Sequence, residues 1–342
     1  MINAAFDIIE FLKSNFSFLF SLGLYSVLAV LLAKSIKKNY KVYYWLFGVL
    51  SFGFIIPSLA RLLGVTLPFN LSSIPILGLS AGELSSAANF IHPVLVIIMY
   101  MGALSAKIPA VGKLLSIRKE LSIIVGFPVL AHVVKRLFGT FPGGWQYFFD
   151  HETYIQNPRV VSVLGSGITS FAFVLGLVMT ILFLVLWITS FDSVHRKMGT
   201  KRWKSVQRWS YGLYAMLFLH SLALQVGGMV SDNAREVQRA KIEVAEGASH
   251  GARPSAEAQR GAPQQGVQQS HGAKPSQELQ KGAPQPQQGV QQSHGHGRPK
   301  SFAFADLEIS RSAKRWVNIV ALFVIYGSYL YLRVRKARRR RA

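Results

Sequence analysis

Seven blocks of apolar residues constrain this chain more than any other feature of its sequence. A helix needs about 20 mostly apolar residues to cross a hydrocarbon core of roughly 30 Å. The blocks fall at residues 16–34, 42–64, 86–106, 120–138, 161–190, 207–228 and 313–332. Only 15% of the residues are charged, against about 25% in a typical soluble domain. The sequence therefore predicts an all-α integral membrane protein of about seven transmembrane helices.

The basic residues predict how the chain is oriented. Positively charged loops stay on the cytoplasmic side of a membrane. Lys and Arg gather in four segments that alternate with the apolar blocks: Lys34–Lys41, Lys107–Lys119, Arg196–Arg208 and Arg333–Arg341. Seven spans place all four on one side, with the N-terminus outside and the C-terminus in the cytoplasm. The net charge of +23 comes with no nucleic-acid-binding motif, so we expect no nucleic-acid partner.

Two further features limit the chemistry of the chain. It has no cysteine, which excludes disulfides, iron–sulfur clusters, thiolate-ligated haem and covalently attached haem, but not a haem held by histidines. Asp7 and Glu10 precede the first apolar block, and no small-residue cleavage site follows it. We therefore expect that block to be a retained helix rather than a signal peptide.

Residues 229–312 have a different composition, rich in Gln, Gly, Pro, Ser and Ala. A repeat begins at Ser249, begins again at Ser270 and survives as a stub at Ser293. Such a segment buries too little apolar surface to offset its ordering entropy, so we expect a disordered extracytoplasmic loop. Its histidines are either weak metal ligands or, as we favour, polar linker residues copied with the repeat: His250, His271, His294 and His296.

Histidines inside the apolar blocks are the candidate functional residues. Ionisable residues at membrane depth are costly and usually serve a function. His132 follows Arg118 by 14 residues and His220 follows Arg208 by 12, on two spans that run in the same direction. Both therefore lie roughly 20 Å from the inner surface, where two imidazoles can clamp one haem iron. The alternative is a pair of interhelical hydrogen bonds. His92 is a third candidate, either a ligand, a propionate partner or a packed histidine.

The basic segment before His220 carries a resemblance. The run from Thr189-Ser190 through Arg196-Lys197-Met-Gly199 and Lys201-Arg-Trp203 to Tyr211 and His220 resembles the ferric reductase-like transmembrane family. It is most similar to the haem-binding membrane subunits of the bacterial methionine sulfoxide reductase system, the YedZ/MsrQ group. The resemblance covers about residues 80–228 and implies a six-helix haem bundle in a bacterial inner membrane. Residues 1–40 then form an extra transmembrane helix, 41–228 the core, and 313–342 the last helix with a basic cytoplasmic tail.

The chain departs from this family at two positions. Members often carry a second histidine 13 or 14 residues earlier on each ligand helix, but here these positions are Gln207 and Arg118. We therefore expect one haem b, held by His132 and His220. Pro128, four residues before His132, should kink its helix. Trp203 and Trp209 lie among the cations of Arg196–Arg208, either as a docking face for a flavin (FMN or FAD) or as interfacial anchors.

These features predict a membrane b-type cytochrome that acts as an oxidoreductase or electron-transfer subunit. Electrons would come from a separate donor, a flavin reductase or a membrane quinol, and leave to an extracytoplasmic acceptor. A single outer haem leaves about 20 Å to the inner surface, a gap that the sequence does not bridge. The competing hypothesis is a non-redox transporter or partner-binding scaffold that uses the histidines as polar contacts.

Overall fold

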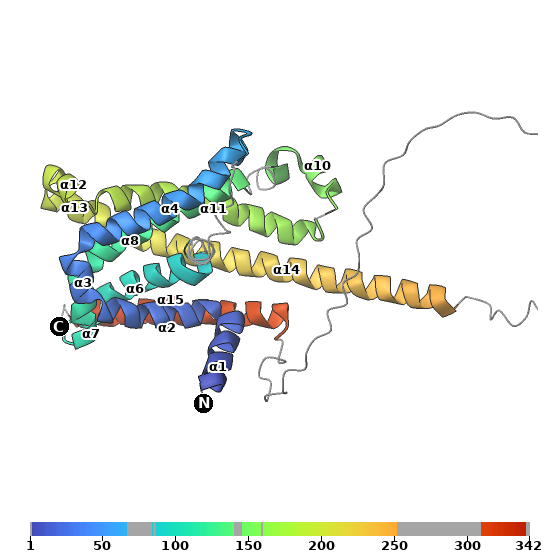
Figure 1. Ribbon diagram of the computed structural model, residues 1–342, viewed down its shortest axis with the longest axis horizontal. Coiled ribbons are helices and arrows are strands. Elements are labelled where there is room, and N and C mark those ends of the chain that lie inside the picture. The colour runs from blue at the N-terminus through green and yellow to red at the C-terminus, as the bar shows by residue number, and fades with distance from the viewer. Residues whose placement is uncertain are drawn as a thin grey trace, which may run out of the picture. The chain divides into compact units, whose positions relative to one another are not determined.

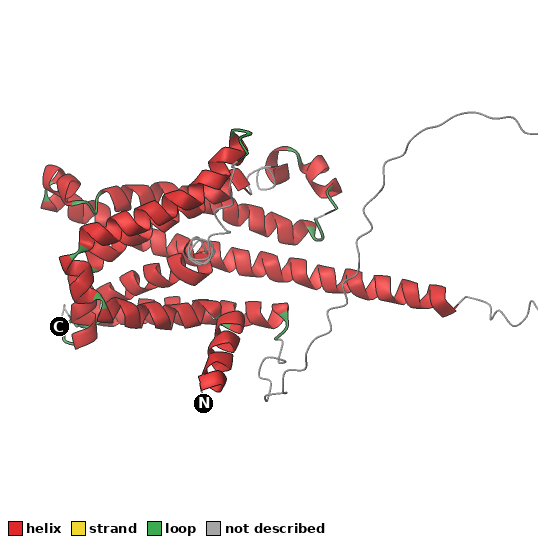
Figure 2. Ribbon diagram, in the orientation of Figure 1, coloured by secondary structure: helices red, strands yellow, loops and turns green. Residues whose placement is uncertain are grey.

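The computed structural model describes residues 2–66, 84, 87–139, 146–158, 160–251 and 309–339. Every regular element in these ranges is helical, which confirms the all-α prediction (Figure 2). The chain forms two compact units, Met1–Gln238 with Phe304–Ala342, and Arg239–Ala303. The intramembrane histidine candidates His92, His132 and His220 all belong to the first unit. The described part of the second is the last stretch of helix α14.

The long helices of the first unit coincide with the apolar blocks. They are α2 (Ser17–Leu31), α4 (Tyr40–Leu62), α6 (His92–Ala103), α8 (Arg118–Gly139), α11 (Val163–Ile188), α14 (Ser210–Gly251) and α15 (Arg311–Arg338). The remaining elements are α1 (Ile2–Asn15), α3 (Ala33–Lys38), the π-helical turn η2 (Ala87–Ile91), α7 (Pro109–Ser116), α10 (His151–Gln156), α12 (Asp192–Met198) and α13 (Thr200–Gln207). Helix α4 packs along α8, and α2 packs along α6. Ile117, Val125 and Ala131 of the α8 region are fully buried in the resulting core.

The number of helices that can cross a membrane differs from the sequence-based count. Within the described ranges, five helices are long and apolar enough, or six if α1 and α2, bent by 115° at their junction, count as one span. The block at 86–106 forms η2 and α6, and its apolar helix Asn89–Ala103 is shorter than a full span. The chain is thus a multi-pass helical membrane protein by length and composition, while seven spans remain a prediction.

Helix α14 runs well beyond the predicted end of its span. We expected the span to end at residue 228 and a disordered loop to follow, but the helix continues to Gly251. Residues 229–248 are rich in Ala, Glu and Arg, which favour helix, and the helix ends three residues into the first repeat, before its first proline at Pro254. The expected disorder of residues 252–308 lies outside the described residues.

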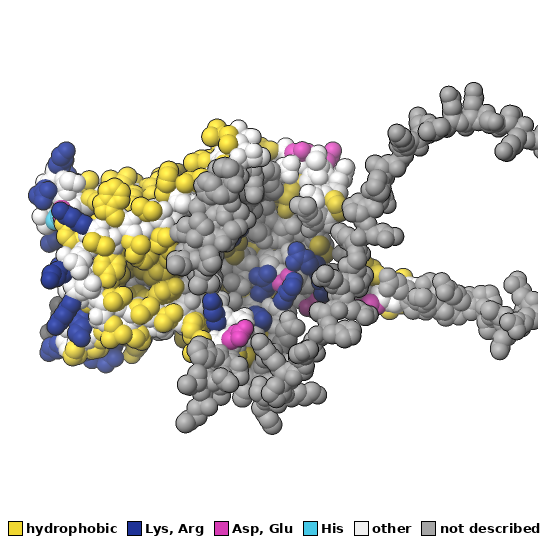
Figure 3. Space-filling model, in the orientation of Figure 1, with side chains coloured by type: hydrophobic (Ala, Val, Ile, Leu, Met, Phe, Trp, Pro, Cys, Tyr) yellow, Lys and Arg dark blue, Asp and Glu magenta, His cyan; other side chains and the backbone are white. Residues whose placement is uncertain are grey.

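The basic segments meet at one end of the first unit. Figure 1 shows α3, α7, α12, α13 and the C-terminal end of α15 at the same end of the long helices. In Figure 3, Lys and Arg side chains gather there and an apolar band begins beside them. Lys37 of α3 donates to the buried carboxylate of Glu120 on α8 at 2.9 Å. This arrangement is the one that the alternation of basic and apolar segments predicts.

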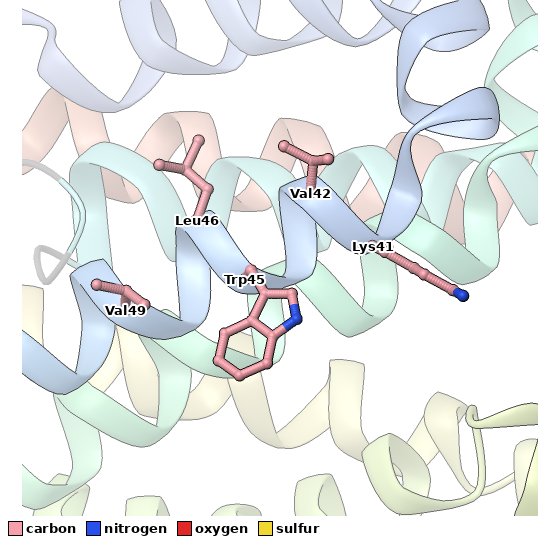
Figure 4. A pocket seen from close by; sticks show the side chains of 5 residues that line it. All are labelled: Lys41, Val42, Trp45, Leu46 and Val49. Atoms are coloured by element: carbon pink, nitrogen blue, oxygen red, sulfur yellow. The ribbon is translucent and has the colours of Figure 1, made fainter.

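The outer face of α4 illustrates the apolar band. Val42, Trp45, Leu46 and Val49 project away from the other helices, and Trp45 is 76% exposed (Figure 4). Lys41 lies one turn before Trp45, at the border of the band. An exposed apolar face beside an interfacial Trp and Lys is typical of a helix that meets lipid. The low burial of this helix therefore fits a membrane environment rather than water.

Candidate functional site

A cavity of about 590 Å³ opens inside the first unit, among α2, α6, α8, α11, α14 and α15. All three intramembrane histidines singled out from the sequence line it: His92, His132 and His220. Apolar side chains surround them, including Leu95, Val129, Phe173, Met179, Phe183, Leu213 and Leu217. The volume lies within the range of about 300–1,000 Å³ typical of cofactor and ligand sites. The structure therefore brings together residues that are far apart in the chain.

His220 is held in one defined orientation by α11. Its Nδ1 atom lies 2.8 Å from the carbonyl oxygen of Ala172, a residue with no exposed surface. A carbonyl oxygen only accepts hydrogen bonds, so Nδ1 carries the proton and donates it. In the neutral ring the lone pair is then on Nε2. A backbone carbonyl at one ring nitrogen and a free lone pair at the other is the usual arrangement of a metal-ligating histidine.

Gly176 of α11 leaves room beside this ring. A Cβ atom at Gly176 would lie 3.1 Å from Cε1 of His220, closer than ordinary packing. Gly176 and His220 both line the cavity. Ala172 and Gly176 are one helical turn apart and therefore lie on the same face of α11. Ala172 accepts the hydrogen bond from the imidazole, and the missing side chain of Gly176 leaves room for the ring.

His132 lies on α8, the candidate span with the largest buried share. Pro128 is inside this helix, four residues earlier, as the sequence analysis noted. Near it, the indole nitrogen of Trp187 on α11 donates to the carbonyl oxygen of Ile123 at 3.1 Å. A Cβ atom at Gly126 would overlap the same indole ring. Trp187 therefore joins α8 to α11 about two turns before His132.

His92 has partners at both ring nitrogens. Its Nε2 lies 3.0 Å from the Tyr326 hydroxyl, and its Nδ1 lies 3.5 Å from the Ser221 hydroxyl. The ring also packs against Phe18 with centroids 4.8 Å apart. The hydrogen bonds join α6 to α14 and α15. These contacts favour the polar-contact interpretation of His92 over a ligand role.

Gln207 and Arg118 occupy the positions where the ferric reductase-like family often has a second histidine, and here both make structural hydrogen bonds. Gln207 is the last residue of α13, and its amide donates to the Thr189 hydroxyl at 3.0 Å. Arg118, the first residue of α8, hydrogen-bonds the buried Tyr214 hydroxyl. Neither residue lines the cavity. The geometry at both positions is consistent with a single site near the histidines.

Three arginines that the sequence did not single out also line the cavity: Arg136, Arg235 and Arg315. Their side chains are partly or fully exposed, and we call this part of the lining the mouth of the cavity. Arg136 follows His132 by four residues and so shares its helix face, a signal that the sequence did contain. Arg235 and Arg315 are linked by the buried carboxylate of Asp232, which accepts from both. Their convergence from α14 and α15 depends on packing that no sequence pattern indicated.

The α12–α13 segment forms a small folded unit at the basic end. Trp203 donates its indole N–H to the Thr189 carbonyl at 2.8 Å, and its ring lies 4.5 Å from that of His195. Trp209 is 59% exposed. Lys119 donates to Asp192 at 2.9 Å, and this bond holds the pKa of the Asp192 carboxyl below its ordinary value. Trp203 thus has a structural contact, and a flavin site here stays a prediction.

The side chains of the repeat histidines, from His250 to His296, lie outside what the structure describes. Within the described ranges, no group of three or more His, Asp or Glu side chains is arranged to hold a metal ion.

Fold and site together define a multi-pass helical membrane protein with a histidine-lined internal cavity. No family model matches the sequence, and neither a curated protein nor a solved structure resembles it significantly. The resemblance to the ferric reductase-like family therefore rests on the residues quoted above.

Proposed function

We propose that this chain is a membrane b-type cytochrome that holds one haem between His132 and His220. The single observation that carries the proposal is the Nδ1–H bond from His220 to Ala172, which leaves the lone pair on Nε2 of a histidine that lines the same cavity as His132. A haem held there would supply one-electron redox chemistry.

The chain's own residues fit such a group in three ways. Ala172 fixes the His220 tautomer, and Gly176 keeps space beside the ring. The apolar side chains that α8, α11 and α14 contribute to the cavity favour a neutral imidazole as ligand. The cavity mouth carries cations, which suit the acidic groups of a porphyrin.

The direction of transfer follows from the same proposal. The basic end of the first unit would face the cytoplasm and the cavity mouth the opposite side. A separate flavin reductase or membrane quinol would be the donor, and an extracytoplasmic molecule the acceptor. The site residues in this proposal are His132 and His220 as iron ligands, with His92 beside them in the cavity and hydrogen-bonded to Tyr326 and Ser221.

The test is a reduced-minus-oxidised spectrum of the full chain purified in detergent, with haem quantified per chain. We expect one haem per chain and a Soret band that moves on reduction. His132→Ala and His220→Ala should each abolish the band, while His92→Ala, the matched control from the same cavity, should retain it. A colourless wild-type protein would contradict the proposal and favour the transporter or scaffold hypothesis.

A further inference from the structure

The mouth of the cavity concentrates positive charge. The guanidinium groups of Arg136, Arg235 and Arg315 line it, and among the described residues the acidic side chain that pairs with Arg235 and Arg315 is Asp232. Three cations and one anion leave a formal excess of two positive charges. This excess of positive charge along an apolar cavity favours an anionic partner, although water screens part of it because the side chains of Arg235 and Arg315 are 45% and 31% exposed.

Asp232 orients two of the three arginines without using up their donors. Its Oδ2 accepts from Nε of Arg315 at 2.6 Å, and its Oδ1 accepts from Nη1 of Arg235 at 3.0 Å. The carboxylate is only 4% exposed. Since a guanidinium has five N–H donors, each arginine keeps several for a ligand. A buried carboxylate that positions arginines is a built feature rather than an accidental surface pair.

Gly228 allows the Arg315 guanidinium to reach the cavity. A Cβ atom at Gly228 would meet the Nη1 atom of Arg315, and the Nη2 atom would be 2.6 Å away. Both residues line the cavity. The guanidinium therefore lies directly on the backbone of α14, where a side chain at position 228 would displace it.

Arg136 lines the same cavity from helix α8. It lies on α8 one turn beyond His132, and the described residues offer its guanidinium no hydrogen-bond acceptor. Asn318, Ser231 and Gln225 add neutral polar groups at the same mouth, and the side-chain oxygen of Gln225 is buried without a partner. The mouth thus combines free guanidinium donors with amides and hydroxyls.

We infer that Arg136, Arg235 and Arg315 form a carboxylate-binding site at the mouth of the histidine-lined cavity. Planar guanidinium groups pair with carboxylates in two-point contacts, and an excess of two charges matches a dianion. The carboxylates come either from the two propionates of a haem in the cavity, in which case the inference rests on the proposed function, or from a free small polycarboxylate. In both cases the ligand chemistry is the same.

The experiment uses the full chain, purified in detergent and stripped of haem. Haem and haem dimethyl ester, which lacks free carboxylates, are titrated by absorbance, and citrate is titrated by calorimetry. If propionates are the ligand, the wild type binds haem at least about tenfold more tightly than the ester, and Arg136→Gln/Arg315→Gln removes that preference. If a free carboxylate is the ligand, citrate binds the wild type and binding is lost in the double variant. Lys314→Gln, a neighbour on α15 outside the cavity lining, is the control and should change neither result.

Two outcomes would overturn the inference: equal binding of haem and ester with no heat from citrate, or unchanged binding in the double variant. If the wild type binds no haem at all, the proposed function fails, but the citrate titration still decides the carboxylate site. Arg136→Gln alone is the second variant, because Arg136 makes no ion pair with the described residues, unlike Arg235 and Arg315. It should lower haem or citrate affinity severalfold without shifting the thermal unfolding midpoint.

Discussion

The indole nitrogen of Trp187 donates to the backbone carbonyl of Ile123 and so joins α11 to α8 close to Pro128. Proline removes a helical hydrogen bond and disturbs the preceding turn. The Trp187 ring occupies the space that Gly126 leaves open. This contact positions the segment of α8 that carries His132.

We expect Trp187→Phe to weaken this contact while keeping most of the apolar packing. Loss of one hydrogen bond to a buried carbonyl costs about 1–2 kcal/mol, which should lower the thermal unfolding midpoint in detergent. If the proposed function holds, the Soret band should also broaden or shift as His132 loses its fixed position. Trp209→Phe, at an exposed indole, is the control. An unchanged midpoint for Trp187→Phe would show that the contact does not support α8.

A side chain at Gly176 should disturb His220 directly. We expect Gly176→Leu to displace the imidazole and, under the proposed function, to reduce haem content per chain severalfold, because the cavity loses volume beside the ligand. Gly212→Leu on α14 is the matched control, since a Cβ at Gly212 meets only the Leu182 side chain at 3.9 Å. Equal haem content in the two variants would contradict the role given to Gly176.

Asp232→Asn should loosen the junction between α14 and α15. The carboxylate accepts charge-assisted hydrogen bonds from Arg235 and Arg315, and such bonds contribute about 1.5–3 kcal/mol each when desolvated. Because both arginines are partly exposed, we expect a total loss of about 1–2 kcal/mol, measured by thermal unfolding. Glu236→Gln, at an exposed neighbour on the same helix, should have almost no effect. A larger loss for the control than for Asp232→Asn would contradict this account.

The Lys119–Asp192 contact should give a small pH dependence. Its hydrogen bond lowers the pKa of the Asp192 carboxyl in the folded protein. A lowered folded-state pKa stabilises the protein above the unfolded pKa, and that stability is lost as pH falls through the folded-state value. Asp192 is 59% exposed, so we expect only a few tenths of a kcal/mol. Unfolding midpoints of wild type and Asp192→Asn should differ slightly at pH 7 and converge in strong acid. A difference that grew with acidity would have the wrong sign.

The pattern of apolar blocks and the expected depth of the histidines in the membrane predicted much of this structure, but not all of it. Apolar blocks predicted the long helices because lipid leaves the backbone few alternatives to helix. The depth argument predicted that His132 and His220 lie near each other, and they line one cavity. The bend between α1 and α2 was missed because nothing in the pattern around Phe16 marks it. Residues 229–248 were assigned to a loop because their composition was averaged with the Pro-rich repeats that follow.

The sequence indicated the candidate ligand histidines of the site but not the residues that surround them. Ala172 and Gly176 could not be recognised as site residues, because small residues in an apolar block are accounted for by helix packing alone. Arg315 reaches the cavity only because α15 returns beside α14, a long-range contact that no local pattern encodes. Sequence periodicity predicts which residues share a helix face, whereas the packing of the folded chain decides which distant helices pair.

The ion pair between Lys37 and Glu120 makes the N-terminal region part of the molecule's architecture rather than a removable appendage. Ser17 and Phe18 of the same region form one wall of the cavity, and α2 packs along α6. A version trimmed to begin at residue 41 would leave the buried Glu120 without this lysine and the cavity open on that side. Residues 1–40, which the sequence analysis treated as an extra helix, therefore help to enclose the histidines.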